Sequence, residues 1–292
     1  MRSSSAFAAV LASLPTALAA AACPTLELIY ARATTEPKGL GAAGGLLAKD
    51  LAKDLPGASV YAVNYPASMG SLNTCEGPMD LIKQVKTRVD SCPGIKLALG
   101  GHSQGGAVVT ATVSKIPAKY LKSIVAVTLF GAPPCSDLTK STVPGVAEVG
   151  ARCKSFCNYK DQICDSTGAM GNGGPRAACT LPKSFSPRRR ELEVKDFGMG
   201  YPAYIEPRPL SEQESLRVNR INKQAGAATC GEDERGHKAG STTGLAAHMA
   251  YKSDGYYVAA ASCYIAKMYK AAGGAAPPHP AAAAGSSATE TD

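Results

Sequence analysis

Apolar and polar residues follow one another in short blocks that predict a sheet flanked by helices. Continuous apolar runs have the length of buried strands, and between them apolar residues recur every three to four positions, as on one face of a helix. The expected strands cover 26–31, 59–63, 96–100, 124–130 and 152–156. The expected helices cover 44–55, 79–89, 106–113 and 255–271. This alternation predicts an α/β fold with a parallel sheet and helices on both faces.

The pattern is lost in two parts of the chain. Residues 165–245 are rich in Gly, Pro, Arg and Glu, and 211–224 is the one helix expected there. The end, 273–292, consists largely of Ala, Pro, Gly, Ser and Thr, so it cannot bury a core and is expected to be disordered. The prediction is one domain over 23–272, with an irregular insertion at 165–245.

The start of the chain and its cysteines predict a secreted protein. Residues 1–22 hold one arginine and then an apolar, alanine-rich run, which is typical of a signal peptide cut between Ala19 and Ala22. Ten cysteines after such a segment indicate disulfides rather than zinc. Acylation of Cys23 is the weaker alternative. No later apolar run approaches twenty residues, so no transmembrane segment is expected.

The charge changes this picture little. The formal net charge is +8, but the basic residues are spread along the chain, and 188–190 is the one tight cluster. Ordinary solubility explains such a spread better than adsorption to an anionic wall polymer or lipid surface. No motif favours nucleic-acid binding.

One pentapeptide carries the candidate chemistry, Gly-His-Ser-Gln-Gly at 101–105. An expected strand precedes it and an expected helix follows it. Strand, G-x-S-x-G and helix form a nucleophile elbow, in which a sharp turn raises the hydroxyl above the sheet. The residues two before and two after the serine must be small. Ser103 is therefore the candidate nucleophile.

A serine hydroxyl needs a base, and chain order selects it among the histidines. In this type of site the acid and then the histidine follow the serine. His248 comes just before the closing helix, where the base is expected. His237 lies in a charged segment, and His279 lies between prolines in the tail. His102 is expected to point its side chain elsewhere, as a packing or rim residue.

The candidate acid is Asp161. It lies between Cys157 and Cys164, and a small disulfide loop there would hold a carboxylate rigidly against an imidazole. Asp165 and Asp137 are the competing acids.

The chain resembles the fungal cutinase and acetylxylan esterase family in four segments, taken in order. Residues 29–36 (IYARATTE) are similar to its "ARGTTE" segment, with Ala33 in place of glycine, and 101–105 to its "GYSQG". Residues 157–164 are similar to its "CNTGDLVC", and 248–251 to its "HLAY". The resemblance implies a three-layer α/β-hydrolase fold with a mostly parallel sheet, here with a long insertion before the histidine.

The resemblance also implies roles for individual residues. Ser103 would be the nucleophile, His248 the base and Asp161 its orienter. The backbone N–H groups of Thr34 and Gln104 would form the oxyanion hole. The family needs neither cofactor nor metal.

Two disulfides follow from the resemblance, Cys23–Cys92 and Cys157–Cys164. The other six cysteines cannot be paired from the sequence, and Cys179–Cys230 is a guess.

The predicted function is a secreted, monomeric serine esterase that acts on cutin-like polyesters or short-chain acyl esters. Apolar residues around the base (Ala247, Met249 and Tyr251) and at 42–47 favour acyl lipids slightly. The alternatives are an acetylxylan esterase, a lipase with the insertion as its lid, and a non-catalytic wall-associated protein. The insertion is either a lid or wall over the cleft or a surface loop without a role in specificity.

Overall fold

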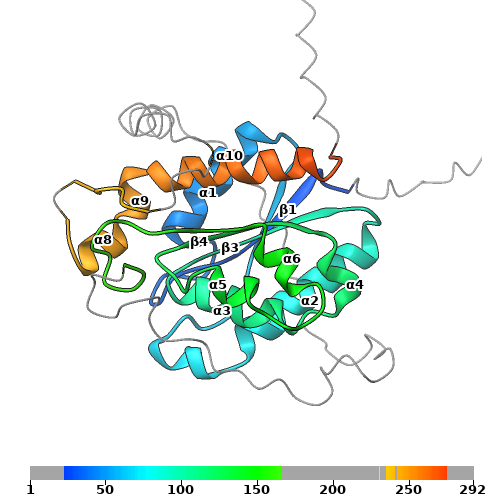
Figure 1. The fold of residues 1–292 in the computed structure, drawn as a ribbon, viewed down its shortest axis with the longest axis horizontal. Helices are drawn as coiled ribbons and strands as arrows, with labels where there is room; N and C mark the ends of the chain where they lie inside the picture. Colours follow the sequence, from blue (N-terminus) through cyan, green and yellow to red (C-terminus); the bar gives the residue numbers. More distant parts are fainter. Residues whose placement is uncertain (1–22, 166–229, 231–234, 241, 275–292) are drawn as a thin grey trace, which may run out of the picture.

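A parallel five-stranded sheet forms the centre of the molecule in the computed structural model, which describes residues 23–165, 230, 235–240 and 242–274 (Figure 1). The strands are β1 (Leu26–Ala31), β2 (Ser59–Ala62), β3 (Lys96–His102), β4 (Ile124–Phe130) and β5 (Cys153–Phe156). Their order is β2-β1-β3-β4-β5, and every pair is parallel. The carboxyl ends of all five strands therefore meet at one edge.

Helices cover both faces of this sheet (Figure 1). On one side lie α1 (Gly41–Asp54) and α10 (Tyr256–Ala271); on the other lie α2 (Glu76–Ser91) and α3 (Gln104–Val113). Strand β1 shows why: Leu28 and Tyr30 pack into the core under α1 and α10, whereas Ile29 and Ala31 pack into the core under α2 and α3. A strand buried on both faces has a continuous apolar run instead of an alternating one.

The structure confirms the predicted α/β architecture. The strands predicted at 26–31 and 124–130 have those bounds, and the other strands and helices predicted within the described residues end within a few residues of the observed ones. The sequence pattern missed short helices of four or five residues. These are η1 (Met69–Asn73), α4 (Ala118–Leu121), α5 (Ser136–Thr139), α6 (Val146–Gly150), α8 (Leu245–Met249) and α9 (Tyr251–Asp254). One-turn helices contain too few residues for a helical period to be seen.

Several predictions concern residues outside the described part of the chain. These are the signal peptide at 1–22, the helix at 211–224, most of the insertion and almost all of the tail. Within the described residues, no helix is both long enough and apolar enough to cross a membrane.

Four disulfides have both of their cysteines among the described residues. They are Cys23–Cys92, Cys135–Cys153, Cys157–Cys164 and Cys230–Cys263. The guess of a Cys179–Cys230 bond is wrong, because Cys230 is bonded to Cys263 in helix α10. The two cysteines are 33 positions apart, so no local pattern in the sequence indicates that they pair. The packing of α10 beside residue 230 brings them together.

Candidate active site

The turn at Ser103 has the backbone of a nucleophile elbow. Strand β3 ends at His102 and α3 begins at Gln104, and between them Ser103 has φ 54° and ψ −120°. A positive φ is uncommon for a residue with a side chain and marks local strain. A Cβ atom at Gly105 would lie 1.9 Å from the carbonyl oxygen of Ala31, so the prediction of a small residue at this position is confirmed.

Asp161 lies in the loop closed by the Cys157–Cys164 disulfide and is fully buried. Its backbone N–H donates to the carbonyl of Asn158 at 3.1 Å, and its Oδ1 accepts the N–H of Ile163 at 2.8 Å. The disulfide and these two bonds fix the direction of the carboxylate.

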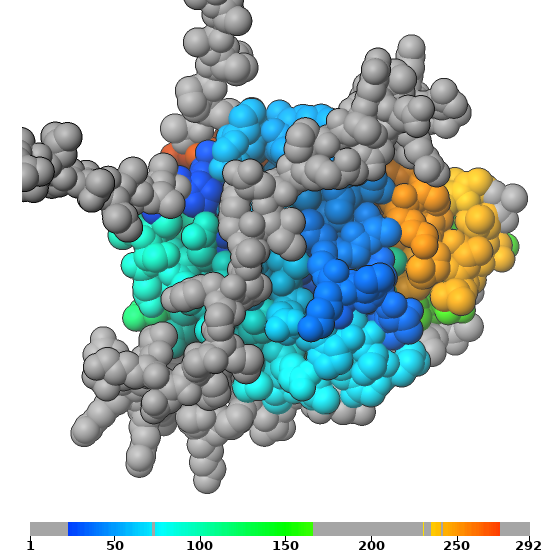
Figure 2. Space-filling model, turned by 180° about the vertical axis from the view of Figure 1, so that it is seen from behind, coloured from blue at the N-terminus to red at the C-terminus, as the bar shows by residue number. Residues whose placement is uncertain are grey.

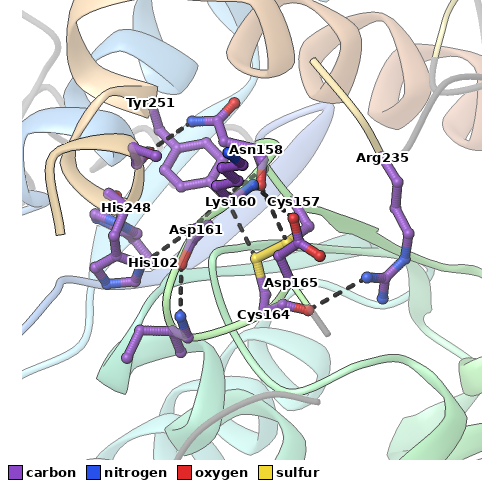
Figure 3. Close-up of polar contacts among 12 residues, drawn as sticks. His102, Cys157, Asn158, Lys160, Asp161, Cys164, Asp165, Arg235, His248 and Tyr251 are labelled. Atoms are coloured by element: carbon purple, nitrogen blue, oxygen red, sulfur yellow. Dashed lines mark hydrogen bonds and ion pairs between the residues drawn. A yellow bond between two sulfur atoms is a disulfide. The ribbon is translucent and has the colours of Figure 1, made fainter. Parts of the chain in front are cut away.

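His248 points its ring at this carboxylate (Figure 3). Its Nδ1 lies 3.0 Å from both oxygens of Asp161, and the side chain is 4% exposed. Because a carboxylate accepts, Nδ1 carries the proton and donates it, which leaves the Nε2 lone pair free to take a proton. The ring centroid of His102, next to Ser103 in the chain, is 5.0 Å from that of His248.

Hydrogen bonds join residues 157–164, the acid loop that contains Asp161, to the segment of His248, although Asp161 and His248 are 87 residues apart in sequence. The N–H of Gly244 donates to the carbonyl of Lys160 at 2.8 Å, just before α8 begins. The amide of Asn158 donates to the carbonyl of Ala247 at 2.8 Å. These bonds make residues 157–164 and α8 one unit.

The end of the predicted insertion belongs to this unit as well. Arg235 pairs with Cys157 in a parallel β-bridge, and its guanidinium donates to the carbonyl of Cys164 at 3.3 Å. The N–H of Tyr159 donates to the carbonyl of His237 at 2.8 Å. The chain thus returns to the acid loop before it reaches the base.

Tyr251 is a buried residue of the site whose contact the sequence did not reveal. Its hydroxyl donates to Oδ2 of Asp161 at 2.8 Å and accepts the N–H of Asn158 at 2.9 Å (Figure 3). Burial, and next the charge of Asp161, raise the pKa of Tyr251 well above its usual range, so the hydroxyl stays a donor. The spacing of three residues after His248 was the available signal.

The ionisation of Asp161 reflects opposing effects. Burial acts to raise its pKa, but the hydrogen bond and charge of His248, the N–H of Ile163 and the hydroxyl of Tyr251 together lower the pKa below its usual value. The carboxylate is therefore the stable form next to the imidazole.

The prediction for His102 is confirmed in part: it is a packing residue, but it packs against the site instead of pointing away from it. Its side chain is 1% exposed and lies against His248 and Tyr251. Because a carbonyl only accepts, Nε2 of His102 is the donor to the carbonyl of His248, at 3.0 Å. Burial, and next the proximity of His248, lower the pKa of His102 to about 3, so its ring is neutral.

Gly131, directly after strand β4, is a second residue that the sequence analysis missed. It has φ 51°, and a Cβ atom there would lie 2.7 Å from Nδ1 of His248 and 2.8 Å from Oδ2 of Asp161. A glycine that ends a buried strand was the visible signal, since such a glycine often permits close approach.

The segment at residues 67–68 bonds to the surroundings of both proposed oxyanion donors, Thr34 and Gln104. The side-chain amide of Gln104 donates to the carbonyl of Ser68 at 2.7 Å, and the N–H of Thr35 donates to the carbonyl of Ala67 at 2.7 Å. As the first residue of α3, Gln104 has a backbone N–H without an intrahelical acceptor.

Alanine fits at position 33. Ala33 is not among the residues with positive φ, and its N–H donates to Oε2 of Glu36 at 2.8 Å. The backbone freedom of a glycine is therefore not needed here.

The competing residues have other contacts. His237 pairs with Asp254 at 3.1 Å and stacks on Tyr256 with ring centroids 3.9 Å apart. Asp165 accepts the N–H of Lys160, and Asp137 is exposed at the start of α5. His279 lies outside the described residues.

The apolar rim predicted around the site is wrong in part. Ala247 and Tyr251 are fully buried and cannot contact a substrate chain. Of the run at 42–47, Ala43 and Leu47 face the core as part of α1. Position in sequence next to the base did not imply exposure.

One group of potential metal ligands occurs among the described residues, formed by Cys157, Asp161 and Cys164 within 4.8 Å. Both sulfurs are in a disulfide, so they offer no thiolate to a metal.

Known proteins are similar to this chain in sequence. A sequence model of the cutinase family, described as "Cutinase", matches residues 22–172. "Probable carboxylesterase Culp3" of Mycobacterium tuberculosis is 34% identical over 154 residues, which cover 49% of this chain and 58% of the relative. "Carboxylesterase Culp1" of the same organism is 35% identical and is covered to 71%, with 50% of this chain matched. The chain thus spans less than two thirds of the first of these relatives.

Among solved structures, a cutinase and an acetylxylan esterase are similar to this chain. A cutinase of Trichoderma reesei, in complex with a phosphonate inhibitor, is 30% identical; the match covers 45% of this chain and 59% of that one, with a TM-score of 0.38. An acetylxylan esterase is 21% identical, with 53% and 88% covered and a TM-score of 0.43.

The sheet order, the elbow after β3 and the position of His248 before the last long helix define an α/β-hydrolase. More narrowly, the match over half of the sequence shows the family, and the chain belongs to the cutinase family.

Proposed function

We propose that this protein is a serine esterase that hydrolyses carboxylic esters through Ser103, His248 and Asp161. The observation that carries the proposal is the pair of 3.0 Å contacts from Nδ1 of His248 to a buried, ionised Asp161. The residue before the strained Ser103, His102, donates to the carbonyl of His248 and so ties the turn to this pair. Family membership supports the same reaction class.

The proposed reaction begins with attack by Oγ of Ser103 on the ester carbonyl carbon, while its proton passes to Nε2 of His248. Asp161 holds the ring and stabilises the imidazolium that forms. The N–H groups of Thr34 and Gln104 donate to the oxyanion. As the C–O bond breaks, His248 returns the proton to the leaving alcohol. Water then attacks the acyl-serine with the same base, and the acid is released.

Two exposed apolar side chains support a substrate with an acyl chain or a polymer surface. Met69 is 77% exposed and follows Ser68, whose carbonyl accepts a hydrogen bond from the side-chain amide of Gln104. Leu245 is 58% exposed and lies on α8, the helix that carries His248. We also propose that the protein works outside the cytoplasm, since four disulfides persist in an oxidising compartment.

The test is the initial rate on p-nitrophenyl acetate, butyrate and palmitate, beside acetate release from acetylated xylan. Ser103→Ala and His248→Ala should each lower the rate by at least about 10³-fold while the circular dichroism spectrum is unchanged. His237→Ala is the matched control and should stay near wild type. A serine-independent rate, or an essential His237, would contradict the proposal.

The substrate profile decides between the candidates. A maximum at butyrate without acetate release from xylan would indicate a cutinase-type esterase. Turnover of acetate alone, together with release from xylan, would indicate an acetylxylan esterase. No serine-dependent turnover on any ester would leave the non-catalytic alternative.

A further inference from the structure

A surface pocket of about 490 Å³ lies beside the proposed oxyanion hole. Its lining comes from two parts of the chain, the loop from Thr34 to Lys38 with the first residues of α1, and Met249 with Lys252. Figure 2 shows the face on which these N-terminal (blue) and C-terminal (orange) parts of the chain lie side by side. The pocket therefore extends from the proposed oxyanion donor to the residue that follows the proposed base.

Two cations are among the residues that line this pocket. Lys38 comes from the loop, Lys252 comes from α9, and both are exposed. Among the described residues, neither ammonium group has a carboxylate within ion-pair distance. The charge of Lys252 also reaches the elbow: after burial and His248, it is one of the effects that lower the pKa of His102.

The single acid of the lining, Glu36, is engaged with the backbone. Its Oε2 accepts the N–H of Ala33 and its Oε1 accepts the N–H of Ala42, each at 2.8 Å. These bonds tie the loop to the start of α1, so the carboxylate is held by the wall and the helix end is already capped. The lysines are left as the charged groups that a ligand can meet.

We infer that this pocket binds an anionic group, a carboxylate or a phosphate, that is part of the ester substrate. The inference rests on the proposed function, which places the scissile carbonyl at Ser103 beside Thr34. Two ammonium groups in the lining of one pocket attract such an anion, and salt screens this attraction because both are exposed. Esters with an anion near the scissile bond are then preferred over neutral esters of the same shape.

The kinetic test compares matched neutral and anionic esters. 4-Methylumbelliferyl butyrate is paired with 7-butyryloxycoumarin-4-acetate, which carries a carboxylate on the alcohol. p-Nitrophenyl octanoate is paired with the p-nitrophenyl monoester of suberic acid, which carries it on the acyl chain. In at least one pair, kcat/KM for the anionic ester should fall about tenfold in Lys38→Gln/Lys252→Gln, while the neutral ester is unaffected.

Lys86→Gln/Lys270→Gln is the matched control, because both lysines are exposed and neither lines the pocket. This control should leave the ratio of kcat/KM for the anionic ester to that for the neutral ester unchanged in both pairs. In wild type, 0.5 M NaCl should lower this ratio, as Lys38→Gln/Lys252→Gln does. An anionic-to-neutral ratio that is the same in wild type and in Lys38→Gln/Lys252→Gln for both pairs would overturn the inference.

A binding measurement separates this inference from the proposed function. Hexyl phosphate and hexanoate are titrated calorimetrically into Ser103→Ala protein, which requires no turnover. The same titration is made with the Ser103→Ala/Lys38→Gln/Lys252→Gln protein. If either anion binds to Ser103→Ala and this binding is lost in the triple variant, the result supports anion binding by the pocket, even if no ester is hydrolysed. Absence of binding by both anions, or binding that is independent of the two lysines, overturns it.

Discussion

At the scale of single residues, Asp161 depends on donors that come from three different segments. Ile163 in its own loop, His248 in α8 and Tyr251 in α9 each donate to the carboxylate. A buried carboxylate is stable only when such bonds replace its lost hydration. Tyr251 is thus proposed as a positioning residue that acts through Asp161.

We predict that Tyr251→Phe weakens both catalysis and the fold, the latter in a pH-dependent way. Because the pKa of Asp161 is lowered in the folded state, its ionisation stabilises the fold above its unfolded pKa of about 4, and this contribution is lost as the pH falls through the folded pKa. Removal of one donor raises the folded pKa. The loss of unfolding free energy, about 1–3 kcal/mol at pH 7, should therefore shrink at pH 3.

The measurement is urea unfolding at both pH values, together with kcat on p-nitrophenyl butyrate. Tyr257→Phe is the matched control, since that buried hydroxyl bonds backbone groups of Cys157 and His237. Its cost should be the same at both pH values. An equal cost of Tyr251→Phe at pH 7 and pH 3, with unchanged kcat, would argue against the positioning role.

At the scale of elements, the acid loop and α8 hold their positions through each other. The backbone N–H of Gly244 and the side-chain amide of Asn158 donate the hydrogen bonds that join them. The guanidinium of Arg235 donates to the carbonyl of Cys164, the last residue of the loop. The Cys157–Cys164 disulfide spans only seven positions, so the loop that it closes is short. We expect the disulfide to act locally, since the loop fixes one carboxylate.

We predict that the Cys157→Ala/Cys164→Ala variant loses more activity than its lost stability explains. Opening this small loop costs about 2.5 kcal/mol by loop-closure entropy, and kcat should fall at temperatures where the variant is still folded. Cys135→Ala/Cys153→Ala is the matched control: its disulfide spans 18 positions and costs about 3 kcal/mol. If both variants keep wild-type kcat while folded, the loop does not orient Asp161.

At the scale of the whole molecule, the bond Cys23–Cys92 connects the start of β1 to the end of α2 across 69 positions. It restrains the unfolded chain more than any other described disulfide, because loop-closure entropy grows with loop length. The bond lies far along β1 and β3 from the carboxyl edge where Ser103 stands.

We predict that Cys23→Ser/Cys92→Ser lowers the free energy of unfolding by about 4 kcal/mol and leaves kcat/KM near wild type. Urea unfolding and esterase kinetics at 25 °C would measure both effects. A fall of kcat/KM in the fully folded variant would show that the amino edge of the sheet is coupled to the site.

Sequence and structure contributed different parts of this description. Buried strands such as 26–31 and 124–130 are visible in the sequence because a strand covered on both faces must be apolar throughout. The turn at Ser103 is visible because its small neighbours are required within a few positions. The cutinase-type assignment likewise rests on local motifs.

The tertiary structure alone decided the contacts between distant segments. His102 against His248, Gly131 beside Asp161, Tyr251 on the same carboxylate and the Cys230–Cys263 bond each join segments that no local period connects. The partners of a buried polar group are set by packing in three dimensions, and the sequence specifies only which groups are present to be paired.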